Sequence, residues 1–404
     1  MTKKQILIIC PIMIFPVKMG SQVRMYNLIK ALASYHAVDI IFRTTTSDPV
    51  SNLLNDQIRS ICNNFHLIIA PNKKNFSSRI YHFLRFKFAK TFFHISDHEY
   101  YFSIGSYVKK VAAIANSKKY DVIISEYWYS CFPICNLEYK PYLIVDTHDI
   151  LSAKISLELN YLGESKKNKA YLKRYIKLEN KCLSLNNLIL SVSETDLKYF
   201  SEIFPDKTHL KVPIGQDWSE FLNYHSEKEK TYSILFYGSL ESQQNTQAFF
   251  RLYYNILPKI KTKLPDVSLL VLGANPPQDI KMLNNDINIF VTGYVEDIKE
   301  YISNCRLMIL PMELGGGFRT RALEVMVLEV PVIGTHNALD NLEITNGLHG
   351  YISDSDEELA SFAVKVLQDD ILRKEIGIHS RQLVLSKYSL KACYDNLSNY
   401  LTEI

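Results

Sequence analysis

The chain has 404 residues, of which 47% are hydrophobic and 22% are charged. This length exceeds what one hydrophobic core serves, so the composition indicates an ordinary globular protein of two domains. Its apolar runs fall short of the roughly 18 residues that a membrane-spanning helix needs, and its seven cysteines lack the pattern of a disulfide framework or a zinc site. We therefore expect a cytoplasmic protein.

The net charge of +4 is divided unequally along the chain. Residues 1–210 hold 28 lysines and arginines against 17 aspartates and glutamates, whereas residues 211–404 hold 18 against 25. In the basic half, residues 72–94 alternate cationic and aromatic side chains, which is typical of a helix lying on an anionic membrane. A core-facing helix with a solvated basic side is the alternative. Nucleic acid is not expected as a partner, because the second half is acidic and shows no recognition motif.

Continuous apolar runs alternate with helical patterns through the first half. The predicted strands cover 5–12, 38–45, 65–71, 121–126, 142–149 and 187–193, with helices in the gaps, for example at 21–34, 99–117 and 166–185. Strands without polar alternation are buried on both faces, as in a parallel sheet. The βα repeat therefore predicts an α/β, doubly wound, Rossmann-like domain.

The same pattern restarts after residues 211–218. Further strands are predicted at 233–239, 267–274, 287–295, 306–312 and 331–335. Two Rossmann-like doubly wound domains facing a central cleft follow from this arrangement. Ligands of such sheets bind beyond the carboxyl ends of the strands.

The glycines are concentrated at one point of a glycine-poor chain. Only 14 occur in 404 residues, yet Gly315, Gly316 and Gly317 are consecutive, between a predicted strand and the helical pattern "FRTRALEVMVLE". Backbone N–H groups at such a helix start bind anions, and glycine allows close approach. Arg319 and Arg321 add charge suited to a diphosphate, and an acid one turn later, Glu324, suits ribose hydroxyls. The alternative is a glycine turn before an amphipathic helix with solvated arginines.

This segment, "LPMELGGGFRTRALEVMVLEVPVIGT", resembles the donor-binding signature of glycosyltransferase family 4, the group 1 glycosyltransferases. The matching positions are Pro311, Gly315 to Gly317, Arg319, Arg321, Leu323, Glu324, Met326, Pro331 and Val332. "FYGSLESQQNTQAFFRLYYNILPKI" is similar to the family's phosphate-loop segment, and "LVLSKYSLKACYDNLSNYL" resembles its terminal helix, which crosses back to the first domain. The resemblance implies a GT-B fold and a retaining transfer from a nucleotide sugar, without a metal.

The first half resembles the family at two further places. "PIMIFPVKMGSQVRMYNLIKAL" is similar to the first βα loop, which implies that Gly20 faces the donor; it is the only glycine before Gly105. "VDTHDILS" matches the segment around the active-site histidine, here His148. Asp146 and Asp149 flank it, but three ligands so close at one strand end splay to different faces, so no metal site is predicted. A core or capping role for His148 is the alternative.

Four positions depart from the family's pattern. Gly316 stands where many members have a glutamate, so backbone N–H groups would act there. Ile214 replaces an asparagine, no arginine follows Gly238, and Glu329 replaces a glycine. The missing arginine leaves phosphate neutralisation mainly to Arg319 and Arg321.

We therefore predict a retaining glycosyltransferase that moves a sugar from a nucleotide-diphosphate sugar to a glycan or lipid-linked acceptor in bacterial-type polysaccharide or glycolipid synthesis. The predicted domains are 1–210 for the acceptor, 211–385 for the nucleotide sugar, and 386–404 as a helix crossing back. We expect peripheral contact with the inner face of the cytoplasmic membrane, and no cofactor besides the co-substrate.

The predicted site residues fall into two groups. The catalytic group is His148, Gly20, Arg319 and Arg321. The substrate- and nucleotide-binding group is Gly238, Ser239, Gly315, Gly316, Gly317, Phe318 and Glu324.

Two other functional classes remain open. A non-transferring sugar-nucleotide enzyme, such as a 2-epimerase, would lack the Arg-x-Arg glycine loop. A non-catalytic nucleotide-sugar-binding subunit would keep Glu324 and the arginines but lose Gly20 and His148.

Overall fold

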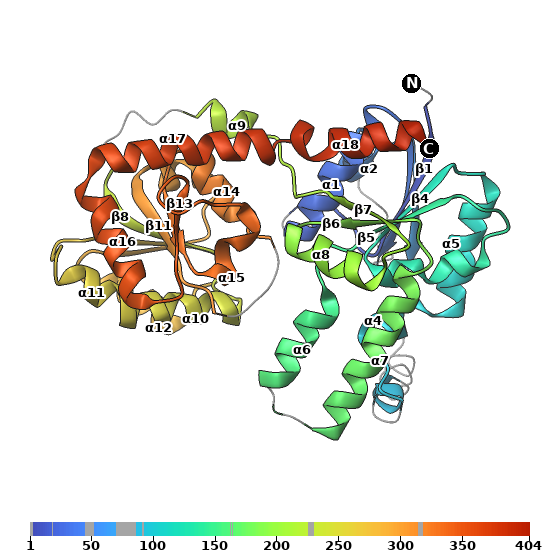
Figure 1. The fold of residues 1–404 in the computed structure, drawn as a ribbon, viewed down its shortest axis with the longest axis horizontal. Coiled ribbons are helices and arrows are strands. Elements are labelled where there is room, and N and C mark those ends of the chain that lie inside the picture. Colours follow the sequence, from blue (N-terminus) through green and yellow to red (C-terminus); the bar gives the residue numbers. More distant parts are fainter. Residues whose placement is uncertain are drawn as a thin grey trace. The chain divides into compact units, whose positions relative to one another are not determined.

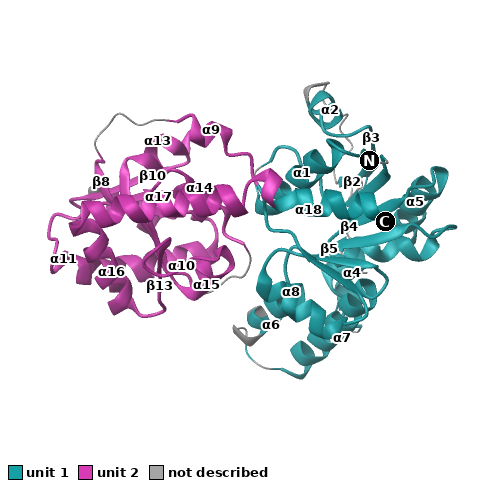
Figure 2. Cartoon of the chain, turned by 45° about the horizontal axis from the view of Figure 1, so that its top comes forward, with its two compact units in different colours: residues 1–215, 393–404 teal, residues 216–392 magenta. Residues whose placement is uncertain are grey.

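The computed structural model describes residues 3–17, 19–44, 52–69, 86–90, 93–161, 163, 165–224, 230–313 and 318–404. The chain forms two compact units (Figure 2). Unit 1 comprises Met1–Gly215 and Cys393–Ile404, and unit 2 comprises Gln216–Ala392. Gly315 to Gly317 and most of the basic segment 72–94 lie outside the described residues.

Unit 1 is built on a parallel sheet of seven strands in the order β3-β2-β1-β4-β5-β6-β7 (Figure 1). The strands are β1 (Gln5–Cys10), β2 (Ala37–Thr44), β3 (Asn64–Ile69), β4 (Val122–Glu126), β5 (Tyr142–Asp146), β6 (Leu188–Ser191) and β7 (Thr208–Lys211). All six predicted strands are confirmed. The analysis missed β7, because its sequence "THLK" is a short, half-exposed edge strand without an apolar run.

The helices of unit 1 flank this sheet. Among the described residues they include α1 (Gly20–Ala33), α2 (Asn52–Arg59), α4 (Asp97–Phe102), α5 (Gly105–Ser117), a 3₁₀ segment (Trp128–Asn136), α6 (Leu151–Tyr161), α7 (Lys166–Leu183), α8 (Glu194–Ile203) and most of α18 (Leu390–Glu403). The single helix predicted at 99–117 is wrong, because α4 ends at Phe102 and α5 begins at Gly105. Serine side chains accept the backbone N–H groups that begin α4, α7 and α8.

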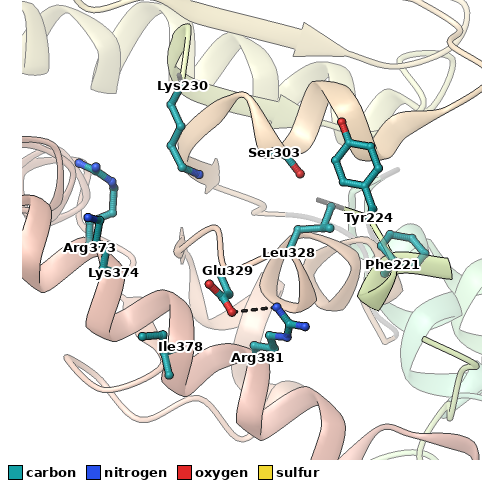
Figure 3. Close-up of a pocket in the computed structure, with 10 residues that line it drawn as sticks. All are labelled: Phe221, Tyr224, Lys230, Ser303, Leu328, Glu329, Arg373, Lys374, Ile378 and Arg381. Atoms are coloured by element: carbon teal, nitrogen blue, oxygen red, sulfur yellow. Dashed lines mark hydrogen bonds and ion pairs between the residues drawn. The ribbon is translucent and has the colours of Figure 1, made fainter. Parts of the chain in front are cut away.

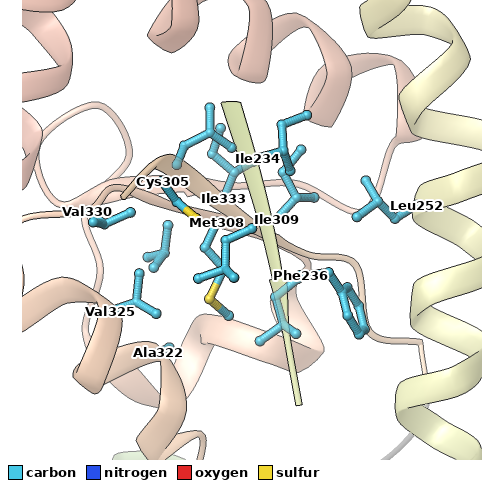
Figure 4. Packing of buried hydrophobic residues seen from close by; sticks show 14 of the residues in the cluster. Ile234, Phe236, Leu252, Cys305, Met308, Ile309, Ala322, Val325, Val330 and Ile333 are labelled. Carbon is cyan, nitrogen blue, oxygen red and sulfur yellow. The ribbon is translucent and has the colours of Figure 1, made fainter. Parts of the chain in front are cut away.

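Unit 2 has a parallel sheet of six strands in the order β10-β9-β8-β11-β12-β13. The strands are β8 (Tyr232–Tyr237), β9 (Leu269–Leu272), β10 (Ile289–Gly293), β11 (Cys305–Leu310), β12 (Val332–Gly334) and β13 (Gly350–Ile352). The five predicted strands are confirmed, and the three-residue β13 was missed. Side chains such as Phe236, Met308 and Val325 fill the core around β8 (Figure 4).

The helices of unit 2 are α9 (Ser219–Leu222), α10 (Gln243–Arg251), a π-helical turn (Leu252–Ile256), α11 (Leu257–Lys261), α12 (Gln278–Met282), α13 (Ile298–Ser303), α14 (Thr320–Val327), α15 (His336–Leu339), α16 (Asp356–Gln368) and α17 (Asp370–Lys387). The "SDSD" segment (353–356) caps a helix: Ser355 accepts the N–H of Glu358 at the start of α16. Both sheets thus have the doubly wound topology predicted from the sequence. None of the described helices is long and apolar enough to cross a bilayer.

Glu329, which replaces a glycine of the family pattern, adopts the left-handed conformation with φ of 59°. That conformation costs a non-glycine residue about 1–2 kcal/mol. The carboxylate of Glu329 pairs with Arg381 of α17 at 2.8 Å. Gly377 of the same helix lies so close that a Cβ there would be 2.5 Å from the carbonyl oxygen of Glu329. The backbone at this position is left-handed, a conformation that glycine adopts without strain, and in this chain a glutamate adopts it instead.

Candidate functional site

The predicted donor residues of unit 2 meet where the strand order reverses, between β8 and β11. Gly238 and Ser239 directly follow β8, and Arg319 and Arg321 come after β11, at the start of α14. The carboxyl-end crevice at such a switch point is where doubly wound sheets bind ligands. The tertiary structure therefore brings together two motifs that lie about 80 residues apart in the sequence.

Arg321 lies directly over Gly238. A Cβ on Gly238 would be 2.1 Å from Nη1 of Arg321, so only glycine leaves room for the guanidinium. Nη2 donates to the Asn245 side-chain oxygen at 2.9 Å, which holds the group in place. Gly273 is required for a related reason, because a Cβ there would be 1.9 Å from the carbonyl oxygen of Gly238.

The surroundings of Arg321 leave its positive charge poorly compensated. Burial, and then the neighbouring Arg319, lower the pKa of Arg321 to about 10, so it still carries its charge at neutral pH. Its Nε is buried without a hydrogen-bond partner among the described residues. Such a group binds an anion favourably, because a bound phosphate would satisfy both its charge and its donors.

Glu324 lies one turn further along α14 and is held by Tyr237 at the end of β8. The Tyr237 hydroxyl donates to Oε2 of Glu324 at 2.9 Å. Burial raises the pKa of Glu324, and the hydrogen bond from Tyr237 opposes that shift. Tyr237 and Asn245 are not among the residues predicted from the sequence, although both lie in the segment that resembles the family's phosphate loop.

The structure describes only some of the other residues that were predicted for the donor site. Phe318 is partly buried, with its ring centroid 5.5 Å from that of Tyr388. Gly315, Gly316 and Gly317 lie outside the described residues, so the anion-binding loop remains a prediction. Arg319 is the residue that precedes the first turn of α14.

In unit 1, His148 belongs to a buried polar cluster at the carboxyl ends of β4 and β5, which Arg24 of α1 joins. Its Nε2 lies 2.6 Å from Oε2 of Glu126, the last residue of β4. Asp146, which ends β5, forms a two-pronged ion pair with Arg24 of α1, with both contacts at 2.7 Å. The four side chains are buried. The analysis missed Glu126 and Arg24; a glutamate ending an apolar strand was the available signal.

The charges of this cluster are nearly balanced. Burial and the neighbouring Asp146 raise the pKa of Glu126, whereas Arg24 and His148 outweigh burial and lower the pKa of Asp146. Arg24 thus neutralises the charge of Asp146 inside the cluster.

The backbone of His148 has an unfavourable conformation, and its ring stacks on that of Tyr127. The φ angle is 59° at His148 and 65° at Tyr127. The two rings stack with centroids 3.9 Å apart and an angle of 12°. Left-handed backbone at two bulky residues costs about 1–3 kcal/mol each and is typical of functional sites.

The ligand-type atoms of Glu126, Asp146 and His148 all lie within 4.8 Å of one another. Asp149, considered from the sequence as a third ligand, is not in this group. Arg24 already supplies a cation to Asp146. Oε1 of Glu126, by contrast, is buried without a hydrogen-bond partner among the described residues. The expectation that the protein uses no metal remains a prediction.

Gly20 is the first residue of α1. A Cβ there would meet no described atom within 4 Å. The chain itself therefore does not require glycine here, so a need for glycine at this position would come from a ligand approaching it. The predicted role of Gly20 stays a prediction.

Comparison with known proteins adds to these observations. Residues 231–369 match the family model "Glycosyl transferases group 1". A 2-deoxystreptamine N-acetyl-D-glucosaminyltransferase of Niallia circulans is 25% identical over 246 residues, which are 55% of this chain and 61% of that protein. The capsular polysaccharide biosynthesis glycosyltransferase CapM of Staphylococcus aureus is 28% identical over 150 residues, 35% of this chain and 39% of that protein. The matches thus span only part of these relatives.

The fold is similar over nearly the whole chain. A sucrose-phosphate synthase structure from Thermosynechococcus elongatus superposes with a TM-score of 0.72 at 15% identity, covering 99% of each chain. At this identity the likeness concerns the fold, and it assigns two Rossmann-like units to the GT-B class.

Proposed function

We propose that the chain is a group 1 glycosyltransferase, the family whose model its residues 231–369 match, and that it transfers a sugar from a nucleotide-diphosphate sugar to a glycan or lipid-linked acceptor. One observation carries the proposal. Arg321 is held over Gly238 at the switch point of unit 2, with its charge poorly compensated. A diphosphate provides the charge and the acceptors that this group lacks.

The proposed donor complex uses the residues of unit 2 in separate roles. Arg319 and Arg321 contact the diphosphate, together with backbone N–H groups that follow β11. Glu324 accepts hydrogen bonds from ribose hydroxyls, and the hydroxyl of Tyr237 fixes its carboxylate. The nucleotide sugar is a co-substrate, and no other cofactor is proposed.

The proposed chemistry retains the configuration of the transferred sugar. The bond between the anomeric carbon and the diphosphate oxygen breaks, and the acceptor oxygen bonds to the anomeric carbon on the same face. The acceptor's proton passes to the departing diphosphate, whose charge the two arginines stabilise. Gly316 removes the acidic residue that many family members carry, so no carboxylate nucleophile of the retaining-hydrolase kind is proposed.

His148 positions the donor sugar in this proposal. Glu126 occupies Nε2 of the ring, and stacking on Tyr127 fixes the ring plane, so Nδ1 is the nitrogen left for a sugar hydroxyl. Positioned polar contacts of this kind contribute to the rate by orientation. Glu126 and Tyr127 are positioning residues, because they act through His148.

Membrane contact is the part of the proposal that concerns location. The first half of the chain carries the excess of positive charge. In its basic segment, Phe88 and Phe93 are 56% and 57% exposed. Exposed aromatics beside cationic residues suit the surface of an anionic bilayer, where a lipid-linked acceptor would be held.

The test of the proposed function is a panel of nucleotide sugars added to the purified chain. The correct donor at a hundred times its Kd should stabilise the protein by about 2.7 kcal/mol and raise its melting temperature. The same donor should then release nucleoside diphosphate when candidate acceptors are added. Stabilisation without diphosphate release, with the sugar epimerised instead, would replace transfer by the non-transferring alternative. No stabilisation by any member would contradict the donor site.

A further inference from the structure

A cavity in unit 2 is lined by residues that precede the strands of its sheet (Figure 3). It has a volume of about 410 Å³. Lys230 precedes β8, Ser303 precedes β11, and Glu329 precedes β12, so the cavity is at the amino ends of these strands. The predicted donor residues Gly238 and Arg321 are instead at the carboxyl ends. This cavity is therefore separate from the donor site, and it is large enough for a small ligand.

The wall of the cavity is strongly basic. Four cationic residues line it, against one carboxylate: Lys230, Arg373, Lys374, Arg381 and Glu329. The carboxylate of Glu329 is 2.8 Å from Nη1 of Arg381. It therefore already pairs with Arg381 and is less available to the other three cations.

The two remaining interior cations have few partners. Arg373 is 7% exposed and pairs with Asp370, a residue one turn earlier on α17 whose side chain is 65% exposed. The ammonium group of Lys230 donates to the carbonyl oxygen of Cys305 at 2.8 Å. Among the described residues, no carboxylate lies within ion-pair distance of Lys230.

The electrostatics of Lys230 follow from this arrangement. Burial, and then the charge of Arg373, lower the pKa of Lys230 to about 8. The electrostatic repulsion between two neighbouring cations decreases when an anion binds between them. Among the described residues, only the carbonyl of Cys305 accepts from its ammonium group, which has three N–H donors, so two are available to such an anion.

Part of the lining is apolar. Phe221, Tyr224 and Leu328 lie away from Arg373 and Lys374, and Ile378 lies on α17 among the basic residues (Figure 3). A ligand with a charged end and a carbon skeleton would contact both the basic and the apolar lining, whereas a bare inorganic ion would contact only the basic part.

We propose that this cavity is a second anion-binding site of the protein, for a small phosphate-bearing molecule that carries at least two negative charges. Its phosphate lies between Lys230 and the guanidinium groups of α17, and its carbon part lies against Phe221 and Leu328. Arginine and lysine together give the forked and point-charge donors that phosphate groups take. Glu329, in its left-handed conformation, holds Arg381 at the cavity wall.

The test is calorimetric titration of the full chain with inorganic pyrophosphate, carried out in an Arg321→Ala background so that the predicted donor site contributes little. Lys230→Gln should weaken pyrophosphate binding by roughly ten- to a hundredfold, the loss of one charge-assisted hydrogen bond. Lys259→Gln is the matched control, because Lys259 is a surface lysine of the same unit that is paired with Glu357 at 2.8 Å. It removes the same charge and should leave the affinity unchanged.

Arg381→Gln gives a second variant on the other side of the cavity, in case Lys230→Gln does not fold. It should also weaken binding, because it removes one cation and leaves Glu329 facing the anion. Equal affinities in wild-type and both cavity variants, or an equal loss in Lys259→Gln, would overturn the proposal. If the cavity variants bound phosphatidylglycerol vesicles more weakly but kept their affinity for pyrophosphate, the ligand would be a lipid headgroup, and the proposal of a free small molecule would be overturned. Failure of the donor-site proposal would show instead as Arg321→Ala without effect on nucleotide-sugar binding.

Discussion

Gly238→Ala offers the sharpest probe of the donor site, because it adds one methyl group and removes nothing. The new Cβ would lie 2.1 Å from Nη1 and 3.0 Å from Cζ of Arg321. Carbon contacts need roughly 3.5 Å, so the guanidinium must retreat by more than about 1 Å. That movement breaks its 2.9 Å hydrogen bond to Asn245 and takes its charge away from the diphosphate.

The expected loss of nucleotide-sugar binding is about 1.5–3 kcal/mol, the value of one charge-assisted hydrogen bond, or roughly ten- to a hundredfold in Kd. The free energy of unfolding should fall by no more than a similar amount, because the atoms that must move are at the end of a flexible side chain. The assay is calorimetric titration with the donor that gives the largest shift in the nucleotide-sugar panel, together with urea unfolding of each variant.

Two controls make this result specific. Gly105→Ala adds the same methyl group where no atom lies within 4 Å, so donor affinity should be unchanged. In an Arg321→Ala background, Gly238→Ala should have little further effect, since the group that it displaces is gone. Unchanged affinity in Gly238→Ala, or the same loss with and without Arg321, would refute the view that Arg321 holds the donor.

Four other outcomes are expected. Glu324→Gln keeps the hydrogen bond from Tyr237 but loses the charge, so donor Kd should rise roughly tenfold; an unchanged Kd in calorimetry would remove Glu324 from the ribose contact. His148→Ala should lower turnover by about 10²-fold while donor Kd changes less, and normal turnover in a correctly folded variant would give His148 a structural role. Burial raises the pKa of Glu179 to about 7, so the folded state binds the extra proton and wild-type stability should fall as pH rises from about 4.5 to 7. Glu179→Gln should remove that fall, worth up to about 3 kcal/mol in urea unfolding at pH 5 and 8, and an identical pH profile would count against it. Anionic liposomes should sediment the protein, and replacing the lysines and arginines of 72–94 should abolish this; equal pelleting with neutral liposomes would exclude the electrostatic contact.

Much of the fold followed from local patterns. Eleven predicted strands are present, because a strand buried on both faces must be apolar along its length, and this can be read without knowing its neighbours. The two missed strands, β7 and β13, are four and three residues long and lie at sheet edges, where neither length nor burial leaves a pattern. The break between α4 and α5 falls at Ser103 and Gly105, a local signal that the prediction of a single helix did not use.

The sequence by itself determined the residues whose chemistry is local: the arginines and glutamate that begin α14, and the histidine that follows β5. It could not determine their partners. Tyr237 reaches Glu324 across 87 positions, and Arg24 reaches Asp146 across 122, so only the folded sheet order brings these groups together. The same holds for the basic cavity, whose walls come from segments between residues 221 and 381. Periodicity reports which face of an element is buried, but contacts between distant elements are set by the packing of the whole unit, and it is this packing that decides which buried charges are paired and which are left for a ligand.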